Sequence, residues 1–402
     1  MSAGATAVAV VDADRARRDW LILAAAVVAF GFGFGINIGI TPDFTARHLE
    51  IPRAQLGLLE SLREVPGLLA AGLVGLLAVL PRPAMGRLAL AILGVGICCT
   101  GLAGSLGPLI AINVFWSIGL HIWLSVQPSL TLSLSKAGHS GFGLGMMNRY
   151  MALAMMTGLA LVGLTAGHLG HGIIYLIGGL SIIAGSVIVS RLSSALNGEV
   201  EHRLLFRREY WRYYLLMLLD GGRRQVVQTF ALLILVKEFN VDARGIAPLL
   251  VLNQALTMAV SPYLGRLTDR LGERRVLFAY YSLVAVIFLG YTQIEFAANR
   301  FAVSAGMLFS CVYVVDSVLF AASVGIQTYI RHVAPPEELA PSIAMGITWN
   351  HVAAVSVPLA AGWIWAGFGY QRIFAFGIIL ALLAALTCLT LPRRGPTGVA
   401  PS

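Results

Sequence analysis

Apolar segments long enough to cross a lipid bilayer recur along the whole of this 402-residue chain. A spanning helix needs about 20 apolar residues to cross about 30 Å of hydrocarbon. In lipid, backbone groups are satisfied only within helices or closed barrels, and runs of this length indicate helices. The predicted spans are 20–41, 55–80, 87–105, 108–134, 143–167, 172–191, 212–236, 245–266, 274–293, 301–329, 341–367 and 371–391. The sequence therefore predicts an all-α membrane protein with twelve transmembrane helices.

Composition supports lipid as the solvent. The chain is 58% hydrophobic and 12% charged, with a mean hydropathy of +0.81, whereas a soluble globular domain carries about 25% charged residues. The net charge of +9 is spread over short clusters and forms no basic face, so we expect no nucleic-acid partner. The four cysteines lie in apolar segments without metal-ligand spacing. The first apolar run exceeds a signal-peptide core, so we expect it to be retained.

A polar stretch over residues 193–211 divides the predicted spans into two sets of six. We expect an N-terminal six-helix bundle over 1–191, a cytoplasmic linker over 192–210, and a C-terminal six-helix bundle with a short tail over 211–402. The basic clusters at 15–18, 203–212 and 266–275 then fall on one side, and the positive-inside rule makes that side cytoplasmic. Both termini are predicted to be cytoplasmic. The basic residues on the opposite side are Arg47, Arg53, Lys237, Arg244, Arg300 and Arg372.

The segment between the eighth and ninth predicted spans carries a specific motif. Its characteristic residues are Gly265, Asp269, Arg270, Gly272, Arg274 and Arg275. We expect Gly265 to allow close helix approach, Asp269 to pair with a neighbouring arginine or cap a helix start, and Gly272 to form a tight turn. A basic loop that only follows the orientation rule is the alternative. The spacing G-x-x-x-D-R-x-G-x-R-R resembles the loop signature of the major facilitator superfamily.

This resemblance implies two six-helix halves that rock about a central cavity, with the motif segment latching the cytoplasmic side. It also implies that spans one, four, seven and ten line the cavity. The corresponding segment between spans two and three, 80–87, lacks the aspartate and the first glycine. Span four lacks the arginine, and span five the proline-bearing glycine repeat, of proton-coupled drug exporters of the superfamily. A drug or metabolite efflux permease is therefore the alternative rather than the leading prediction.

Span seven places three ionisable side chains near the middle of the bilayer. At 1.5 Å per residue, Asp220 lies about 13 Å into the span, and Arg223 and Arg224 about 18 to 20 Å. Asp220 and Arg224 are four residues apart and suited to an ion pair, and Gln228 is predicted to extend the same face. Asp220 neutralises only one arginine, which leaves the other for an anionic substrate. A charge network with Asp316 of span ten is the alternative, and it would leave no net positive site.

Other polar residues within the predicted spans are candidates for the pathway or for gating. In span two, Glu60, Arg63 and Glu64 are expected to form a structural or gating ion-pair group, with the Glu60–Arg63 pair sharing a face. Asp316 is either the partner of an arginine or a proton carrier. The remaining candidates are His121 of span four and Asn350 and His351 of span eleven, each structural or functional, and Asn37 of span one, a cavity contact beside the packing glycines Gly31, Gly35 and Gly39.

The leading prediction is a secondary active transporter that moves a small solute by alternating access in the cell (inner) membrane. An organic anion would suit an unpaired arginine, and a proton is the expected coupling ion, although facilitated diffusion fits equally. A membrane-embedded enzyme or non-transport protein is the rival. The sequence contains neither a nucleotide-binding loop nor an H-E-x-x-H pattern, so we expect no enzymatic activity, catalytic residue, cofactor or metal. We expect a monomer in the lipid bilayer, with the substrate and coupling ion as partners.

Overall fold

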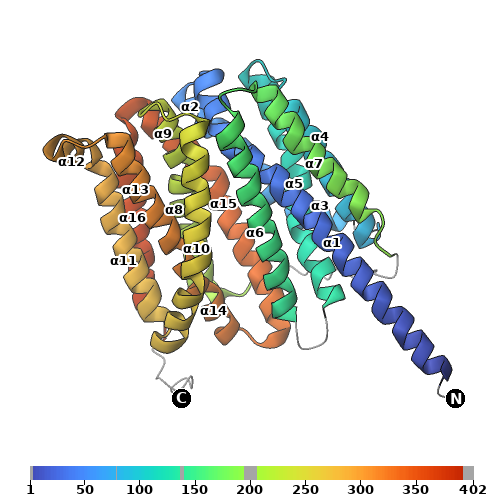
Figure 1. The fold of residues 1–402 in the computed structure, drawn as a ribbon. Coiled ribbons are helices and arrows are strands. Elements are labelled where there is room, and N and C mark those ends of the chain that lie inside the picture. Colours follow the sequence, from blue (N-terminus) through green and yellow to red (C-terminus); the bar gives the residue numbers. More distant parts are fainter. Residues whose placement is uncertain (1–2, 78, 136–139, 194–205, 393–402) are drawn as a thin grey trace. The chain divides into compact units, whose positions relative to one another are not determined.

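The computed structural model describes residues 3–77, 79–135, 140–193 and 206–392, and these ranges contain helices and no strand (Figure 1). The first group of helices is α1 (Ala3–Asp43), α2 (Arg53–Leu68), α3 (Ala70–Leu76), α4 (Arg82–Thr100), α5 (Leu106–Leu134), α6 (Ser140–Thr165) and α7 (His171–Val189). The second is α8 (Trp211–Gln225), α9 (Leu232–Lys237), α10 (Ala243–Leu271), α11 (Glu273–Thr292), α12 (Ile294–Phe301), α13 (Ala305–Leu319), α14 (Val324–Val333), α15 (Pro336–Phe368) and α16 (Tyr370–Leu389). Short π turns at Phe44–His48 and Val226–Ala231, and 3₁₀ turns at Arg208–Tyr210 and Phe320–Ser323, join some of them. The predicted all-helical class is confirmed.

Ten helical stretches in the described residues are long and apolar enough to cross a membrane. They are Asp14–His48, Arg82–Thr100, Leu106–Leu134, Phe142–Thr165, His171–Val189, Ala243–Leu271, Glu273–Thr292, Ala305–Val333, Pro341–Phe368 and Tyr370–Leu389. The two predicted spans that fall short, 55–80 and 212–236, are helical but interrupted, at the α2–α3 break and at the π turn after α8. Both carry the ionisable residues that lower their hydropathy. The count of twelve spans therefore stays a prediction.

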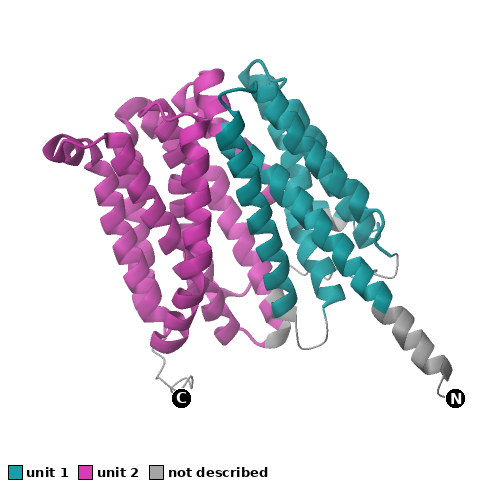
Figure 2. Ribbon diagram, viewed as in Figure 1, with its two compact units in different colours: residues 1–41, 69–201 teal, residues 42–68, 202–402 magenta. Residues whose placement is uncertain are grey.

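The described helices form two compact units (Figure 2). Unit 1 comprises residues 1–41 and 69–201, and unit 2 comprises residues 42–68 and 202–402. Residues 42–68, which the sequence division assigns to the N-terminal half, lie in unit 2 because α2 packs along α15. Most of the predicted linker, 194–205, lies outside the described residues, and the boundaries of the two predicted bundles stay predictions.

Small residues set the helix packing in unit 1. A Cβ atom on Gly31 would lie 2.6 Å from the carbonyl oxygen of Met151, and one on Gly35 would meet the carbonyl of Met155, both on α6. Gly33, on another face of α1, approaches the backbone of α7. The predicted packing role of this glycine repeat is confirmed. Elsewhere in unit 1, α4 packs against α5 and α7.

In unit 2, α8 is packed by α15 and α16, while α11 packs against α16. Aromatic side chains fill the space between α11, α13 and α16. The rings of Tyr291 and Phe374 stack with centroids 4.1 Å apart, and Phe309 lies 4.7 Å from Tyr291. Offset and edge contacts of this kind stabilise a core beyond area burial. This packing holds the polar face of α8 between fixed neighbours.

The contact between α2 and α15 depends on a glycine pair. A Cβ atom on Gly57 would collide with the carbonyl of Pro358 and would lie 2.8 Å from the Cα of Gly362. One turn further along α2, the Ser61 hydroxyl donates to the carbonyl of Val355 at 2.6 Å. The two helix backbones therefore lie too close for any side chain at position 57.

We expect Gly57→Ala to lower the free energy of unfolding by about 1–3 kcal/mol, the usual effect of overpacking. Thermal unfolding of the purified protein in detergent measures this change. Gly290→Ala is the matched control, because Gly290 is helical and nothing lies within 4 Å of the added carbon. An unchanged melting temperature for Gly57→Ala would contradict the close contact, because it would mean that α2 and α15 can move apart without loss of stability.

Candidate functional site

The candidate site is the polar face of α8 in unit 2, where three ionisable side chains lie within one helical turn. Asp220 and Arg223 retain only 6% and 1% of their surface exposure, and Arg224 is half-buried. A charged group at the middle of a membrane costs about 2.5–3.5 kcal/mol on insertion scales, so each requires a partner. The partners come from α11, α13 and α15.

Arg223 forms an ion pair with Asp316 of α13. Its Nη2 atom donates to Asp316 Oδ1 at 2.7 Å, and both side chains are almost fully buried, with 1% and 0% exposed. The guanidinium carbon also lies 5.4–5.9 Å from the ring centroids of Tyr280, Phe288 and Phe320. Of the two roles that the sequence left open for Asp316, the geometry agrees with that of the arginine's partner.

Asp220 is bound by two neighbouring tyrosines of α11. The hydroxyls of Tyr281 and Tyr280 donate to Asp220 Oδ1 at 3.1 and 3.4 Å. The predicted ion pair between Asp220 and Arg224 is not formed in this structure: within the described ranges, Asp220 has no ion pair within 4 Å. The reason is tertiary packing, because α11 supplies hydroxyl donors to Asp220 while Arg224 points toward α15. Sequence reasoning missed both tyrosines.

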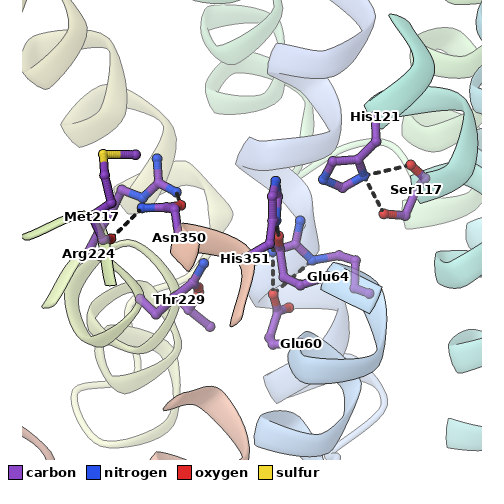
Figure 3. Close-up of polar contacts among 11 residues, drawn as sticks. Glu60, Glu64, Ser117, His121, Met217, Arg224, Thr229, Asn350 and His351 are labelled. Atoms are coloured by element: carbon purple, nitrogen blue, oxygen red, sulfur yellow. Dashed lines mark hydrogen bonds and ion pairs between the residues drawn. The ribbon is translucent and has the colours of Figure 1, made fainter. Parts of the chain in front are cut away.

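Arg224 has a neutral partner. Its Nη2 atom donates to Asn350 Oδ1 of α15, and Asn350 Nδ2 donates to the carbonyl of Met217 at 3.3 Å (Figure 3). A Cβ atom on Gly221 would lie 2.6 Å from Asn350 Nδ2, so the glycine provides the space in which the amide sits. The hydrogen bond to the Met217 carbonyl of α8 thus fixes the orientation of the Asn350 amide. It presents its oxygen to the guanidinium.

The α-helical register of span seven ends at Gln225. A π turn, Val226–Ala231, follows, and it has a wider repeat than an α-helix. Gln228 is exposed, whereas Gln225 is buried and accepts a 2.8 Å hydrogen bond from the Thr229 hydroxyl. The prediction that Gln228 continues the face of Asp220 and Arg224 is wrong, because it assumed an uninterrupted α-helix.

A second charged cluster joins α2 to α15 within unit 2. Arg63 Nη2 lies 2.8 Å from a carboxylate oxygen of Glu60 and 2.8 Å from one of Glu64. Glu64 in turn lies 3.4 Å from Nδ1 of His351, the neighbour of Asn350 on α15 (Figure 3). The predicted ion-pair group of all three residues is present, and Glu64 lies as close to Arg63 as Glu60 does, although only the Glu60–Arg63 spacing was expected to share a face. Its gating role stays a prediction.

The two candidates in unit 1 are both buried. His121 of α5 is 6% exposed, and its Nδ1 lies 2.8 Å from the carbonyl oxygen of Ser117 (Figure 3). Because a carbonyl only accepts, Nδ1 carries the proton in this contact. Asn37 of α1 is 4% exposed, and the Thr41 hydroxyl donates to its backbone carbonyl at 2.6 Å and lies 3.4 Å from its side-chain Oδ1. Both side chains have local structural contacts, and their pathway roles stay predictions.

The motif segment is mostly helix rather than loop. α10 continues to Leu271 and ends at Gly272, whose φ of 81° is a conformation that glycine adopts readily. Two predicted roles are wrong for the described residues. Nothing lies within 4 Å of a Cβ placed on Gly265, so no other helix of unit 2 approaches it closely. Asp269 is exposed in the last turn of α10, where it neither pairs with an arginine nor caps a helix start.

Other residues of this segment make the contacts that fix it in unit 2. Arg274 Nη1 donates to the carbonyl of Leu391 at 3.0 Å, just beyond the end of α16. Glu273, at the start of α11, lies 2.6 Å from Nδ1 of His332 at the end of α14. Arg270 and Arg275 are exposed. The latch role of the motif residues Gly265, Asp269, Arg270, Gly272, Arg274 and Arg275 stays a prediction.

Outside the spanning helices, Glu338 connects the start of α15 to the segment before α8. Its carboxylate accepts hydrogen bonds from Tyr210 Oη at 2.7 Å and from Arg207 Nε at 3.1 Å. These bonds, first from Tyr210 and then from Arg207, hold the pKa of Glu338 below its ordinary value of 4.5. Burial and the bond to Glu338 raise the pKa of Tyr210 to about 12, so its hydroxyl stays a donor.

A lowered folded-state pKa stabilises the protein above the unfolded-state pKa, and this stabilisation is lost as pH falls through the folded-state value. We expect the wild type to lose thermal stability below about pH 4.5 more steeply than Glu338→Gln, as measured by unfolding between pH 7 and pH 3.5. Glu209→Gln is the control, because Glu209 makes no hydrogen bond or ion pair among the described residues. Parallel curves for wild type and Glu338→Gln would contradict the assignment.

The ten long apolar helical stretches among the described residues are those of a multi-pass membrane protein. The sequence profile of the Major Facilitator Superfamily matches residues 22–313 and 213–402. The chain belongs to this superfamily of membrane transporters. No curated protein sequence matches it significantly.

Solved structures share the fold at low sequence identity. The nucleoside transporter NupG superposes with a TM-score of 0.75 at 12% identity, covering 93% of this chain and 98% of that one. The D-xylose-proton symporter gives 0.71 at 12%, covering 95% and 99%. A bacterial homologue of the human lysosomal transporter Spinster, in an inward-facing and occupied conformation, gives 0.70 at 14%, covering 92% and 95%. At these identities the likeness establishes the fold alone.

Proposed function

We propose that this protein is a secondary active transporter in the cell (inner) membrane that moves a small organic anion by alternating access, coupled to protons. The observation that carries the proposal is Arg224. It is an arginine in the middle of span seven whose partner, Asn350, is an uncharged amide. The charge of this guanidinium is therefore available to a substrate.

The comparison with Arg223 supports this choice. Arg223 is 1% exposed, is neutralised by Asp316 and is enclosed by aromatic rings. Arg224 is half-buried and has no carboxylate within 4 Å among the described residues. A guanidinium presents parallel N–H donors that match a carboxylate or phosphate in bidentate geometry. Arg224 would hold the anion, and Asn350 would orient the guanidinium.

The remaining candidates have supporting roles in this proposal. Asp220 and Asp316 balance the arginines, and His121 and Asn37 contribute polar groups to the pathway. The α2 cluster of Glu60, Arg63 and Glu64, with His351, is proposed to couple the position of α2 to that of α15. It is connected to Arg224 through two adjacent residues of α15, since His351 follows Asn350 directly.

A neutral solute is the competing substrate class, because NupG and the D-xylose-proton symporter are named for uncharged nucleosides and a pentose. Such solutes would be bound by hydrogen bonds and ring stacking and would not require a buried cation. An efflux permease of the same fold, with an organic cation as cargo, would require net negative charge. The span-seven set instead has equal numbers of acidic and basic groups once Asp316 is included.

A thermal-shift screen of the purified protein tests the proposal. The anions are lactate, benzoate, succinate and glycerol 3-phosphate, and the comparison solutes are uridine, D-xylose and tetraethylammonium. A ligand at 100 times its dissociation constant stabilises the folded state by about 2.7 kcal/mol. We expect one or more of the anions to raise the melting temperature and the other solutes to leave it unchanged. Stabilisation by uridine, D-xylose or tetraethylammonium alone would refute the anion assignment.

A further inference from the structure

Two oppositely charged side chains lie one turn apart on α8 without being paired. Asp220 and Arg224 are separated by four residues within a continuous α-helix, the spacing at which side chains share a face and reach each other. Asp220 is instead bound by Tyr280 and Tyr281, and Arg224 by Asn350. Every one of these alternative partners is uncharged. An Asp220–Arg224 ion pair is therefore a second arrangement available to the same residues.

We propose that Asp220 is the proton-binding carboxyl group of the transport cycle and that it competes with the substrate anion for Arg224. This inference rests on the proposed function. When Asp220 is protonated, it stays with the tyrosine hydroxyls and Arg224 binds the anion. When Asp220 is ionised and the anion has left, the carboxylate pairs with Arg224 and closes the anion site.

In this proposal, the buried charges of α8 and α13 determine how many protons accompany each substrate anion. Asp220 and Asp316 supply two negative charges, and Arg223 and Arg224 supply two positive charges, so this set is neutral when both carboxylates are ionised and no anion is bound. An entering monoanion gives the set a net charge of −1. A proton on one carboxylate restores neutrality. Because uncompensated charge is costly in a low-dielectric site, one proton should accompany each monoanion.

Contact geometry distinguishes the two carboxylates. Asp316 is 0% exposed and lies 2.7 Å from Arg223, so protonating it would leave Arg223 buried without its counter-charge. Asp220 retains 6% exposure and contacts only neutral hydroxyl donors. A proton on Asp220 therefore breaks no ion pair. It removes the one negative charge that competes for Arg224.

The groups around Asp220 on the neighbouring elements are consistent with this assignment. On α15 the side chain of His351 pairs with Glu64 of α2, and the neutral Asn350 contacts α8. On α14, Gln327 contacts Met217 of α8. The titratable and charged groups that interact with Asp220 are Arg223 and Arg224 of α8, Tyr280 and Tyr281 of α11, Asp316 of α13 and Cys388 of α16.

The pH dependence of anion binding tests the proposal. Dissociation constants for lactate, benzoate, succinate and glycerol 3-phosphate would be measured calorimetrically between pH 5.5 and pH 8.5. For the wild type we expect the affinity for a bound monocarboxylate to fall with rising pH, approaching tenfold per unit, the limit for one linked proton. Asp220→Asn should retain binding with a flat pH profile. An Asp220→Asn profile as steep as that of the wild type would overturn the proposal.

A measurement on the wild type alone keeps the inference testable if Asp220→Asn does not fold. Proton uptake on adding lactate or benzoate in weakly buffered solution should approach one proton per bound anion on the alkaline side of the transition. Anion binding with no proton uptake would overturn this inference, together with the proton coupling, and leave the assignment of Arg224 to an anion site intact. Absence of binding by all four anions at every pH would overturn both.

The tyrosine pair provides a positioning variant. Tyr281→Phe removes the closer donor to Asp220, at 3.1 Å, and leaves the ring in place. The carboxylate should then pair more readily with Arg224, so anion affinity at pH 8.5 should fall severalfold while affinity at pH 5.5 stays unchanged. A purely structural role for Tyr281 would lower affinity equally at both pH values, and that result would count against the exchange.

Discussion

Arg224→Gln is expected to weaken binding of the substrate anion about 100-fold and to reduce its uptake to a similar extent. A hydrogen bond to a charged group contributes about 1.5–3 kcal/mol, and the upper end of this range corresponds to about two orders of magnitude in affinity. The upper end applies here because the site lies at membrane depth. Calorimetry with the anions of the thermal-shift screen measures the affinity, and proteoliposome uptake measures the rate.

Two variants control for this substitution. Gln228→Ala lies on the same span but beyond the α-to-π transition, where the side chain is exposed, and should bind anions like the wild type. Arg224→Lys keeps the charge but loses the bidentate fork, so it should recover part of the affinity. If a folded Arg224→Gln protein bound the anion with wild-type affinity, Arg224 would not be part of the anion site.

Arg223→Met is expected to lower the free energy of unfolding by about 3–5 kcal/mol, because it leaves Asp316 buried without its counter-charge. Asp316→Asn should have a comparable effect through the unpaired Arg223. The double variant Arg223→Met with Asp316→Asn removes both charges and should be more stable than either single variant. Thermal unfolding of the four proteins forms a double-mutant cycle that isolates the pair.

The same cycle separates a structural pair from a substrate site. If Arg223 served the substrate, the double variant would lose anion binding while recovering stability. The geometry predicts that the double variant recovers stability and keeps measurable anion affinity, because Arg224 is retained. If the loss of stability in the double variant equalled the sum of the losses in the two single variants, the ion pair between Arg223 and Asp316 would be contradicted.

Hydropathy predicts most of this fold, because the length of an apolar run is a local property of the sequence. The segments 55–80 and 212–236 stay predicted spans, because their charges and interrupted helices keep them outside the ten apolar helices of the described residues. The assignment of α2 was also beyond sequence reasoning. Its packing against α15 depends on the encounter of Gly57 with Pro358 and Gly362, which lie far away along the chain.

For the candidate site too, local sequence properties could be predicted, whereas contacts between distant helices could not. Span seven could be singled out because buried charges are rare in membranes, and Asp316 could be named as an alternative partner. Which arginine takes Asp316 could not be derived, because it depends on the rotation of α8 against α13. The roles of Tyr280, Tyr281 and Asn350 depend likewise on contacts between distant helices. The π turn that displaces Gln228 has no residue signature in this sequence.

Uptake into proteoliposomes under an imposed pH gradient tests the central claim most directly. The anion that gives the largest thermal shift would be followed with wild-type protein and with Arg224→Gln, and uridine and D-xylose would be followed in parallel. We predict that the wild type accumulates the anion in the alkaline lumen, that Arg224→Gln does not, and that neither protein accumulates the neutral solutes. Accumulation of uridine or D-xylose without the anion, or equal anion uptake by Arg224→Gln, would contradict the account.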